Sequence, residues 1–348
     1  TVADFNRDGW EDIFVSNDFF ERDYLYMNNK NGTFSEELIN QIQSISGASM
    51  GADAADIDND GFNDLFVTEM LPSEYERLKT VTTFEDWNKY QYNVKNGYYH
   101  QFTRNMLHRN NGISFGNKLT FSEVGRLAGV EATDWSWSAL ITDFDNNGHK
   151  DLFIANGLAQ DILDQDYLNY ISNEEITKMV VNQKGVDYEK LIDIIPVTKI
   201  SNYAYSGDSS LGFKDVTEYW GLDIPSHSNG AAYGDLDNDG DIDLIVNNVN
   251  MQSFIYENRS TELLKENNFL KVKLIGEKMN LNAVGAKVTI KSNDQIFYLE
   301  QSPNRGFQSS VDKIMNFGLG RITNIDSLIV DWYYGKRTIL TDISVNQT

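Results

Sequence analysis

Short apolar runs recur along the first three quarters of the chain, and each comes directly after an acidic segment that contains glycine. The runs are Ile13–Val15, Leu65–Val67, Leu152–Ile154 and Leu244–Val246. Continuous apolar runs of this length are typical of strands buried on both faces. Small residues precede the later runs at 51–55, 136–139 and 230–232, as a strand in a crowded centre requires. We therefore expect each acidic segment to join an inner strand to a buried second strand.

Further strand signals follow each pair. Third strands that run into Asn and Gly turns are expected at 24–29, 105–112 and 254–258. Fourth strands are expected at 33–36, 121–124 and 213–216. Four strands per unit, repeated around an axis, form the blade of a β-propeller.

The end of the chain has a different strand pattern. Leu270–Leu274 alternates apolar and polar residues, and further strands are expected at 287–290 and 327–330. We predict an all-β chain with two domains. Residues 1–265 form a partial β-propeller of four-stranded blades with helical insertions, and residues 266–348 form a small β-domain.

Two insertions, 70–104 and 157–200, interrupt blades between their second and third strands. Both are expected to be partly helical, because Ser73 to Glu76 and Ser172 to Glu175 fit capping boxes. An acidic hairpin joins strands one and two at one end of a blade, so the connection from strand two to strand three lies at the other end. Both insertions are therefore predicted on the face opposite the acidic loops.

The acidic segments share a nine-residue pattern: Asp, any, Asp or Asn, any, Asp or Asn, Gly, any, any, Asp. Its four copies are numbered here as loops one to four. The candidate ligands at positions 1, 3, 5, 7 and 9 are Asp4, Asn6, Asp8, Trp10 and Asp12 in loop one; Asp56, Asp58, Asp60, Phe62 and Asp64 in loop two; Asp143, Asp145, Asn147, His149 and Asp151 in loop three; and Asp235, Asp237, Asp239, Asp241 and Asp243 in loop four.

This spacing favours a calcium site in each loop. Side-chain oxygens of positions 1, 3 and 5 face one centre, position 7 offers its backbone carbonyl, and the aspartate at position 9 completes the shell. An EF-hand is excluded, because its position 12 must be Glu and these loops have an apolar strand residue there. The alternative is a metal-free Asx turn, but such a turn does not need a fixed Asp at position 9. We predict up to four structural Ca²⁺ ions, held most tightly in loops two and four, which have four carboxylates each.

Composition narrows the possible functions. There are 29 Lys and Arg against 52 Asp and Glu, and the net charge of −23 disfavours nucleic acids and anionic membranes as partners. No apolar run is long enough to insert into a membrane, and the absence of cysteine excludes disulfides and thiolate chemistry. The four histidines are scattered, and the sequence contains no metalloprotease, serine-hydrolase or phosphate-loop motif. We therefore predict no catalysis.

The loops resemble the FG-GAP/VCBS repeats of integrin α-chain-like propellers, in which such hairpins hold calcium. The resemblance spans roughly residues 1–265 and implies a propeller of about seven blades. The remainder resembles the ASPIC/UnbV domain of cartilage acidic protein-like proteins, many of them bacterial. The segments that carry this second resemblance are 282–288, 306–310, 316–320 and 326–332. Trp332 departs from the family pattern, because no proline follows it.

Calcium at millimolar concentration is an extracellular condition, so we expect an extracellular, periplasmic or outer cell-surface location. Because loop one begins at residue 4, we expect this chain to be the C-terminal part of a longer protein whose N-terminus carries the signal peptide.

The predicted function is a binding or adhesion module for a protein or glycan ligand, which contacts the face opposite the calcium loops. The alternatives are a carbohydrate-active propeller enzyme such as a polysaccharide lyase, and a structural subunit of an envelope complex. The candidate residues of the ligand face are Trp87, Tyr98, Tyr99, Trp135, Trp137, His227 and Asn229.

Overall fold

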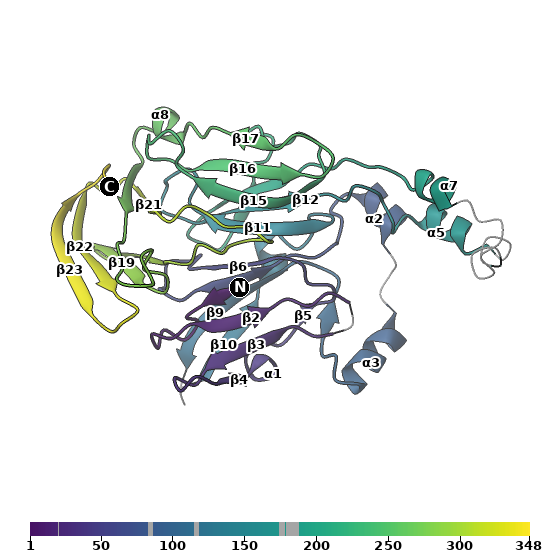
Figure 1. Ribbon diagram of the computed structural model, residues 1–348, viewed down its shortest axis with the longest axis horizontal. Helices are drawn as coiled ribbons and strands as arrows, with labels where there is room; N and C mark the ends of the chain where they lie inside the picture. Colours follow the sequence, from purple (N-terminus) through teal and green to yellow (C-terminus); the bar gives the residue numbers. More distant parts are fainter. Residues whose placement is uncertain (20, 83–85, 115–117, 174–177, 179–187) are drawn as a thin grey trace.

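The computed structural model describes residues 1–19, 21–82, 86–114, 118–173, 178 and 188–348 (Figure 1). Strands dominate these residues, and nearly all of the sheets are antiparallel. The predicted all-β class is therefore confirmed.

Four sheets in sequence order form propeller-like blades. Blade one contains β1 (Val2–Ala3), β2 (Asp12–Val15), β3 (Tyr24–Asn28) and β4 (Phe34–Glu36). Blade two contains β6 (Ala52–Ala55), β7 (Asp64–Val67), β9 (Met106–Ser114) and β10 (Lys118–Glu123). Blade three contains β11 (Ser136–Thr142), β12 (Asp151–Asn156), β13 (Tyr203–Gly207) and β14 (Phe213–Asp215). Blade four contains β15 (Ser228–Gly234), β16 (Asp243–Asn248) and β17 (Phe254–Tyr256).

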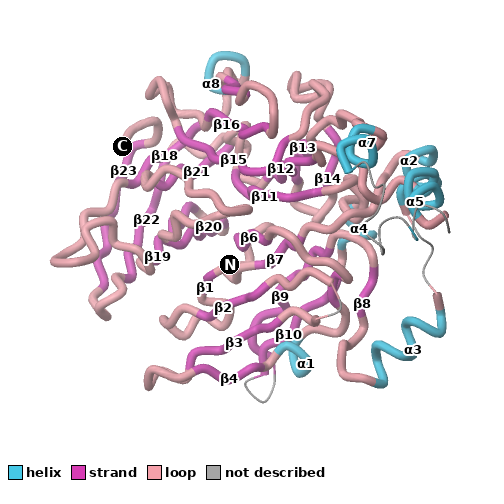
Figure 2. The backbone as a smooth tube through the Cα atoms, turned by 45° about the vertical axis from the view of Figure 1, so that its right-hand side comes forward, coloured by secondary structure: helices cyan, strands magenta, loops and turns pink. Residues whose placement is uncertain are grey.

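The blades pack face to face through apolar side chains. Phe5 and Phe14 of blade one share a buried cluster with Leu65 and Phe121 of blade two. Blades two and three meet around Phe66 and Ile154, and blades three and four meet around Phe153 and Leu244. Full burial of each such side chain stabilises the fold by about 1.5–3 kcal/mol, so the contacts between blades account for the stacking of β1, β6, β11 and β15 at the centre (Figure 2).

The insertions are partly helical, as predicted. The first contains α2 (Tyr75–Val81), α3 (Trp87–Lys95) and β8 (Gln101–Phe102), which pairs with β5 (Ile45–Ser46). The second contains α5 (Gln165–Ile171) and α7 (Tyr188–Asp193). Figure 1 shows these helices at the end of the blades that lies away from the C-terminal domain.

The predicted capping box at Ser73 does not form, and the one from Ser172 to Glu175 falls partly outside the described residues. The N-cap of α2 is Glu74, and the Ser73 hydroxyl instead lies 2.6 Å from the hydroxyl of Tyr203. Asp164 caps the N-terminus of α5, while Ser172 is at its C-terminus and Glu175 lies outside the described residues. Three further helices are single turns: α1 (Leu38–Gln41), α4 (Gly125–Ala128) and α8 (Ser260–Leu263).

The C-terminal domain has a core of its own. Strand β18 (Asn268–Val272) pairs with β21 (Met315–Gly320), and a second sheet has the order β20 (Gln295–Glu300), β19 (Lys287–Ser292), β22 (Asn324–Asp331) and β23 (Arg337–Ser344). Buried side chains from both sheets, including Leu270, Val288, Phe317 and Leu328, form one apolar cluster. The tail is therefore a separately packed β-domain, as its alternating pattern predicts.

The loop between β20 and β21 leaves this domain and runs into the middle of the blades (Figure 1). Its Arg305 is buried and bonds both carboxylate oxygens of Asp53, at 2.7 and 2.8 Å. Gly306 lies so close to β11 that an added Cβ would be 2.3 Å from the Ser138 hydroxyl oxygen. The small residues of the inner strands therefore make room for this loop as well as for one another.

We predict that Arg305→Ala lowers the free energy of unfolding by about 3–5 kcal/mol, because it leaves the buried Asp53 carboxylate without its cation. Urea unfolding followed by tryptophan fluorescence measures the change. The control is Arg321→Ala, whose ion pair with Glu266 is exposed on both sides and should cost less than about 1 kcal/mol. Equal costs for the two variants would contradict a structural role for the inserted loop.

Candidate metal loops

The four acidic loops share one backbone conformation. Each joins the first and second strands of its blade, as predicted. Position 4 is left-handed in every loop, with φ of 55° at Arg7, 58° at Asn59, 56° at Asn146 and 66° at Asn238. The glycine at position 6 has φ between 91° and 100°, a region that other residues rarely adopt. The invariant Gly is thus explained by the turn itself.

The aspartate at position 1 holds the turn together. In loop two, Asp56 accepts the backbone N–H groups of Asp60 and Gly61, both at 3.0 Å. In loop three, Asp143 accepts those of Asn147 at 3.0 Å and Gly148 at 2.8 Å. These bonds hold the carboxylates of Asp56 and Asp143 in place, close to the acidic side chains at positions 3 and 9 of the same loop.

The aspartate at position 9 ties three strands together, a role that the sequence does not reveal. In loop two, one oxygen of Asp64 accepts the N–H of Ile57 at 2.9 Å, and the other accepts the N–H of Asn110 in β9 at 2.7 Å. Asp12, Asp151 and Asp243 make the same pair of bonds in their blades, to Phe5 and Asn28, Phe144 and Gly207, and Leu236 and Asn258 respectively. A fixed Asp at this position is therefore needed for the blade itself, so its presence does not distinguish a calcium site from a metal-free turn.

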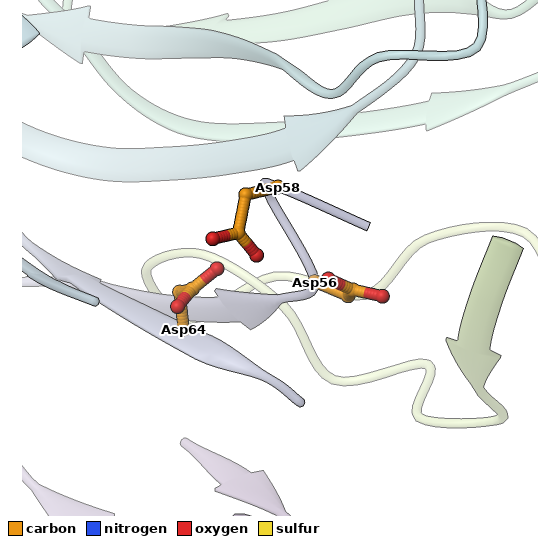
Figure 3. Close-up of side chains that lie close together, drawn as sticks. All are labelled: Asp56, Asp58 and Asp64. Carbon is orange, nitrogen blue, oxygen red and sulfur yellow. The ribbon is translucent and has the colours of Figure 1, made fainter. Parts of the chain in front are cut away.

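Three loops bring three carboxylates within reach of one centre. The groups are Asp56, Asp58 and Asp64; Asp143, Asp145 and Asp151; and Asp235, Asp237 and Asp239, with ligand atoms within 4.8 Å of one another in each group. Figure 3 shows the first group, in which the three side chains come from the two sides of the hairpin. Loops two and three are the more enclosed, since position 1 and position 9 are buried in both.

The electrostatics of these groups fit a bound cation. Burial raises the pKa of Asp56 to about 7 and that of Asp143 to about 7, while attraction to the buried Lys150 opposes the shift in both. Asp58 Oδ1 and Asp235 Oδ1 are buried, and the described residues offer them no hydrogen-bond partner. Several carboxylates with free oxygen atoms, all hard ligands, suit a divalent ion such as Ca²⁺.

Loop one differs from the other three. Asn6 replaces a carboxylate, and among the described residues the acids of this loop do not form a group of three. Lys287 of β19 places its Nζ 3.3 Å from Asp4 Oδ2 and 3.1 Å from Glu11 Oε1. The ammonium group of Lys287 therefore lies beside the acidic side chains of loop one.

Protein cations also reach loops two and four. Lys271 of β18 lies 2.5 Å from Asp235 Oδ2, and Arg109 of β9 lies 2.6 Å from Asp58 Oδ2. Among the described residues, no ion pair involves the carboxylates of loop three. The predicted ranking of the loops rests on counting carboxylates and omits these cations, and it stays a prediction.

At position 7, the backbone N–H bonds to the side chain of position 5 in every loop. The donors are Trp10, Phe62, His149 and Asp241, at 2.7–3.2 Å. The side chain of Asp241 is buried and accepts the N–H of Thr261 at 2.8 Å, so it anchors α8.

A chain of hydrogen bonds links successive loops. The position 4 side chain of each loop donates to the glycine carbonyl of the next: Arg7 to Gly61 at 2.5 Å, Asn59 to Gly148 at 2.9 Å and Asn146 to Gly240 at 3.1 Å. The C-terminal domain joins the chain through the backbone N–H of Gly320, which donates to the Asn146 carbonyl at 2.9 Å. The loops are thus one connected surface beneath the C-terminal domain.

The predicted ligand-face residues divide into exposed and packed side chains. Trp87 is 70% exposed and stacks on Tyr90 at 5.4 Å. Tyr98 and Asn229 are half-buried. The Tyr99 hydroxyl donates to the Ile42 carbonyl at 2.9 Å, and its ring packs on the core between blades one and two.

The remaining candidates are packed into the fold. Trp135 and His227 are buried, so neither side chain is displayed for a ligand. Trp137 packs on Phe307 of the inserted loop, with ring centroids 5.1 Å apart. Residues next to the start of an inner strand lie in the crowded centre, which explains why these aromatic and imidazole groups are covered.

Fold and loops together define a class: a propeller-like module built from acidic hairpin repeats and followed by a β-domain. A family model described as FG-GAP-like repeat matches residues 4–67, and one described as ASPIC and UnbV matches residues 276–348. The chain therefore combines FG-GAP repeats with a C-terminal ASPIC/UnbV domain, as the sequence motifs predict. No curated protein matches the chain.

We predict that Asn59→Gly and Asn146→Gly each lower the free energy of unfolding by about 1 kcal/mol, the usual net worth of one hydrogen bond. Glycine keeps the left-handed turn and removes the bond to the next loop, and at position 146 it also removes the oxygen that accepts from the Asn316 amide at 3.3 Å. The control is Asn238→Gly at the same position of loop four, where the described residues show no side-chain hydrogen bond and φ is 66°. Chemical unfolding measures the free energy of unfolding of the three variants. If Asn238→Gly loses as much stability as the other two, the cause is the added backbone entropy of glycine and not the lost hydrogen bond.

Proposed function

We propose that this chain is a calcium-stabilised binding module that recognises a protein or glycan ligand through the end of the blades that bears the helical insertions. The observation that carries this proposal is the arrangement of the two ends. The acidic loops lie under the C-terminal domain, whereas α2, α3, α5 and α7 lie at the opposite end (Figure 1).

Calcium is the part of the proposal that rests on the carboxylate groups. Asp58 and Asp145 at position 3, together with the aspartates at positions 1 and 9, would hold an ion in loops two and three. In loop four the free Asp235 Oδ1 would serve with Asp237 and Asp239, while Lys271 contacts the other oxygen. Bound ions would cancel the repulsion among these acids and stiffen the hairpins between inner and second strands.

An extracellular, periplasmic or cell-surface location follows from the same proposal, because weak calcium sites of this kind fill at millimolar calcium. Among the described residues, no helix is both long and apolar enough to cross a membrane. The proposed role needs no catalytic residue.

The exposed aromatic side chains of the first insertion support the ligand face. Tyr75 of α2, and Trp87 and Tyr92 of α3, are 75%, 70% and 63% exposed. Exposed aromatic rings of this kind stack on sugar rings or become the anchors of protein interfaces. The stack of Trp87 on Tyr90 holds the indole in place before a ligand binds.

Removal of calcium should lower the melting temperature of the wild-type chain. Each site contributes about 2.7 kcal/mol when calcium stands at about 100 times its dissociation constant. Asp58→Asn should remove part of this gain and about one bound ion, because Asp58 makes no backbone hydrogen bond among the described contacts and its loss spares the hairpin. Differential scanning calorimetry with calcium or EGTA, and ion counting after equilibrium dialysis, provide the two readouts.

The matched control for this experiment is Asp294→Asn, an exposed acid of the C-terminal domain that should change neither readout. The calcium proposal fails if the wild-type chain retains no calcium after dialysis at millimolar concentration and melts at the same temperature in EGTA.

A glycan array, with a pull-down from extracellular protein extracts as its second arm, tests the ligand face. We expect saturable binding that Trp87→Ala weakens at least tenfold, because truncation removes the stacked indole. Tyr334→Ala is the control, since Tyr334 is an exposed aromatic (39%) of the C-terminal domain, outside the insertions. Formation of unsaturated or reducing-end products from a bound glycan would instead favour the polysaccharide lyase.

A further inference from the structure

The residue before the third strand closes the connection from the second strand in the same way in blades one to three. Its side-chain oxygen accepts the backbone N–H of the residue two positions after the apolar run of the second strand. The donor and acceptor residues are Asn17 and Asp23 in blade one, Glu69 and Asn105 in blade two, and Asn156 and Asn202 in blade three, at 2.7–2.9 Å. Two of the three acceptors are amides, whereas blade one has an acid at this place.

In blade two the amide is used in two ways. Asn105 Oδ1 accepts the N–H of Glu69, while Nδ2 donates to the Thr133 hydroxyl at 2.6 Å. Blade one has a hydroxyl at the equivalent position, since Ser49 and Thr133 each lie three residues before the inner strand of the following blade. Asp23 Oδ2 lies 2.8 Å from the Ser49 hydroxyl. A carboxylic acid has an O–H donor that takes the role of the amide N–H, and a carboxylate has none.

The carboxyl group of Asp23 is buried without a cation. Asp23 is 1% exposed, and among the described residues it takes part in no ion pair. The neighbouring Arg22 guanidinium pairs with Glu36 at 2.7 Å and donates to the Asp23 backbone carbonyl at 3.2 Å, not to its side chain. Burial raises the pKa of Asp23 to about 7, although the hydrogen bonds from Asn17 and Ser49 oppose the rise. The group therefore titrates near neutral pH.

The other titratable groups of the surrounding segments have partners of their own or lie in solvent. In the same loop, Glu21 accepts a tyrosine hydroxyl at 2.6 Å, and Asp18 is exposed. In the first insertion, the Tyr99 hydroxyl donates to a backbone carbonyl at 2.9 Å, and His100 Nδ1 lies 2.6 Å from the Tyr90 hydroxyl. The segment between β5 and β6 contains no titratable side chain. The charge of Asp23 is therefore left to its own environment.

The loop that ends at Asp23 holds the base of the first insertion. The Ser49 N–H donates to the Asn17 carbonyl at 3.1 Å. Gln101 of β8 donates from Nε2 to the Glu21 carbonyl at 3.1 Å, and β8 itself pairs with β5. Blade one and the insertion that carries α3 therefore meet at this loop.

We propose that Asp23 is a pH-responsive clasp, which holds the first insertion against blade one when its side chain is a carboxylic acid. In this form Oδ2–H donates to the Ser49 hydroxyl and Oδ1 accepts the Asn17 N–H, as the Asn105 amide does in blade two. When the proton passes to water, a negative charge remains buried without a cation, and this weakens the packing of the loop. The insertion is therefore held more firmly in mildly acidic than in alkaline solution.

The clasp loses stability as the pH rises. In the unfolded chain the carboxyl group has its ordinary pKa of 3.8, and in the folded chain the pKa is about 7. Well below pH 4 both states hold the proton, so ionisation costs nothing. Between pH 4 and pH 7 the unfolded chain ionises more readily than the folded chain, and above pH 7 the cost is complete. From pH 5 to pH 8 this one group therefore lowers the folding equilibrium constant by roughly 10- to 100-fold.

Asp23→Asn tests the clasp, because the amide keeps both hydrogen bonds and cannot ionise. Urea unfolding of wild type and variant, from pH 5 to pH 8 at one calcium concentration, gives the ratio of their folding equilibrium constants. We expect this ratio to change in favour of the variant by roughly 10- to 100-fold over that range. The acids of the metal loops titrate alike in both chains, so they do not enter the ratio.

Two further variants serve as controls. Asn202→Asp places an acid at the same site of blade three, where the amide Nδ2 is buried and has no hydrogen-bond partner among the described residues. Its stability relative to wild type should fall as the pH rises. Asp294→Asn removes an exposed acid of the C-terminal domain, and its ratio to wild type should stay the same across the range.

Hydrogen–deuterium exchange locates the effect. At pH 8, peptides that cover residues 17–23, 45–49 and 99–102 should exchange at least tenfold faster in wild type than in Asp23→Asn. At pH 5 the two chains should differ less, and peptides of the C-terminal domain should not differ at either pH.

A ratio of folding constants that stays level from pH 5 to pH 8 would overturn the proposal, as would an exchange difference spread evenly over the chain. An Asp23→Asn variant that does not fold would also overturn it, because an amide is the native group at this site in blades two and three. Neither readout contains a ligand, so failure of the insertion as a binding face leaves this result intact.

Discussion

Repulsion among carboxylates held close together is the constraint on which the rest of this structure depends. The hairpin between the first two strands of each blade uses aspartate oxygens to accept its own backbone N–H groups, and this fixes several acids within a few ångströms. Burial then raises the pKa of Asp56 and of Asp143. Charge compensation is therefore part of folding, and protein cations supply some of it: Lys287 in loop one, Arg109 in loop two, Lys271 in loop four and the buried Lys150 between loops two and three. The proposed ions would supply the rest.

The position of the C-terminal domain follows from the same constraint. Its lysines pair with the first aspartates of the outermost loops, and its Asn316 donates to the carbonyl of Gly240 in loop four and to Asn146 Oδ1 in loop three. The loop that carries Arg305 extends the contact into the centre of the blades, where Asp53 is the buried partner. One domain thus covers the acidic end and the axis. The insertions are left available, and they are the proposed site of recognition.

Local patterns in the sequence predict much of this fold. The apolar runs, the acidic hairpins and the small inner-strand residues lie where the structure has them, because each pattern reflects the immediate neighbours of one strand. Pairings between distant residues could not be read in this way: Arg305 and Asp53 are 252 positions apart, and Lys287 and Glu11 are 276 apart. Ser73 illustrates the limit, since it fits a capping box locally but bonds to Tyr203 of another blade. Trp135 and His227 are similar cases, because burial by neighbouring segments decides whether a side chain can meet a ligand.

The clustering of acidic side chains in the loops was predictable from the sequence, but the protein cations beside them were not. Counting carboxylates ranks loops two and four first, whereas the structure brings cations from β9 and β18 to these same loops. The aspartate at position 9 likewise has two roles, and only the structure shows the one that joins three strands.

Anomalous scattering from crystals grown at millimolar calcium tests the central claim most directly. The account predicts peaks in loops two, three and four, each about 2.3–2.6 Å from carboxylate oxygens, and none in loop one, where Lys287 stands. Acidic loops with no peak at all, in crystals that contain the folded chain and saturating calcium, would contradict it.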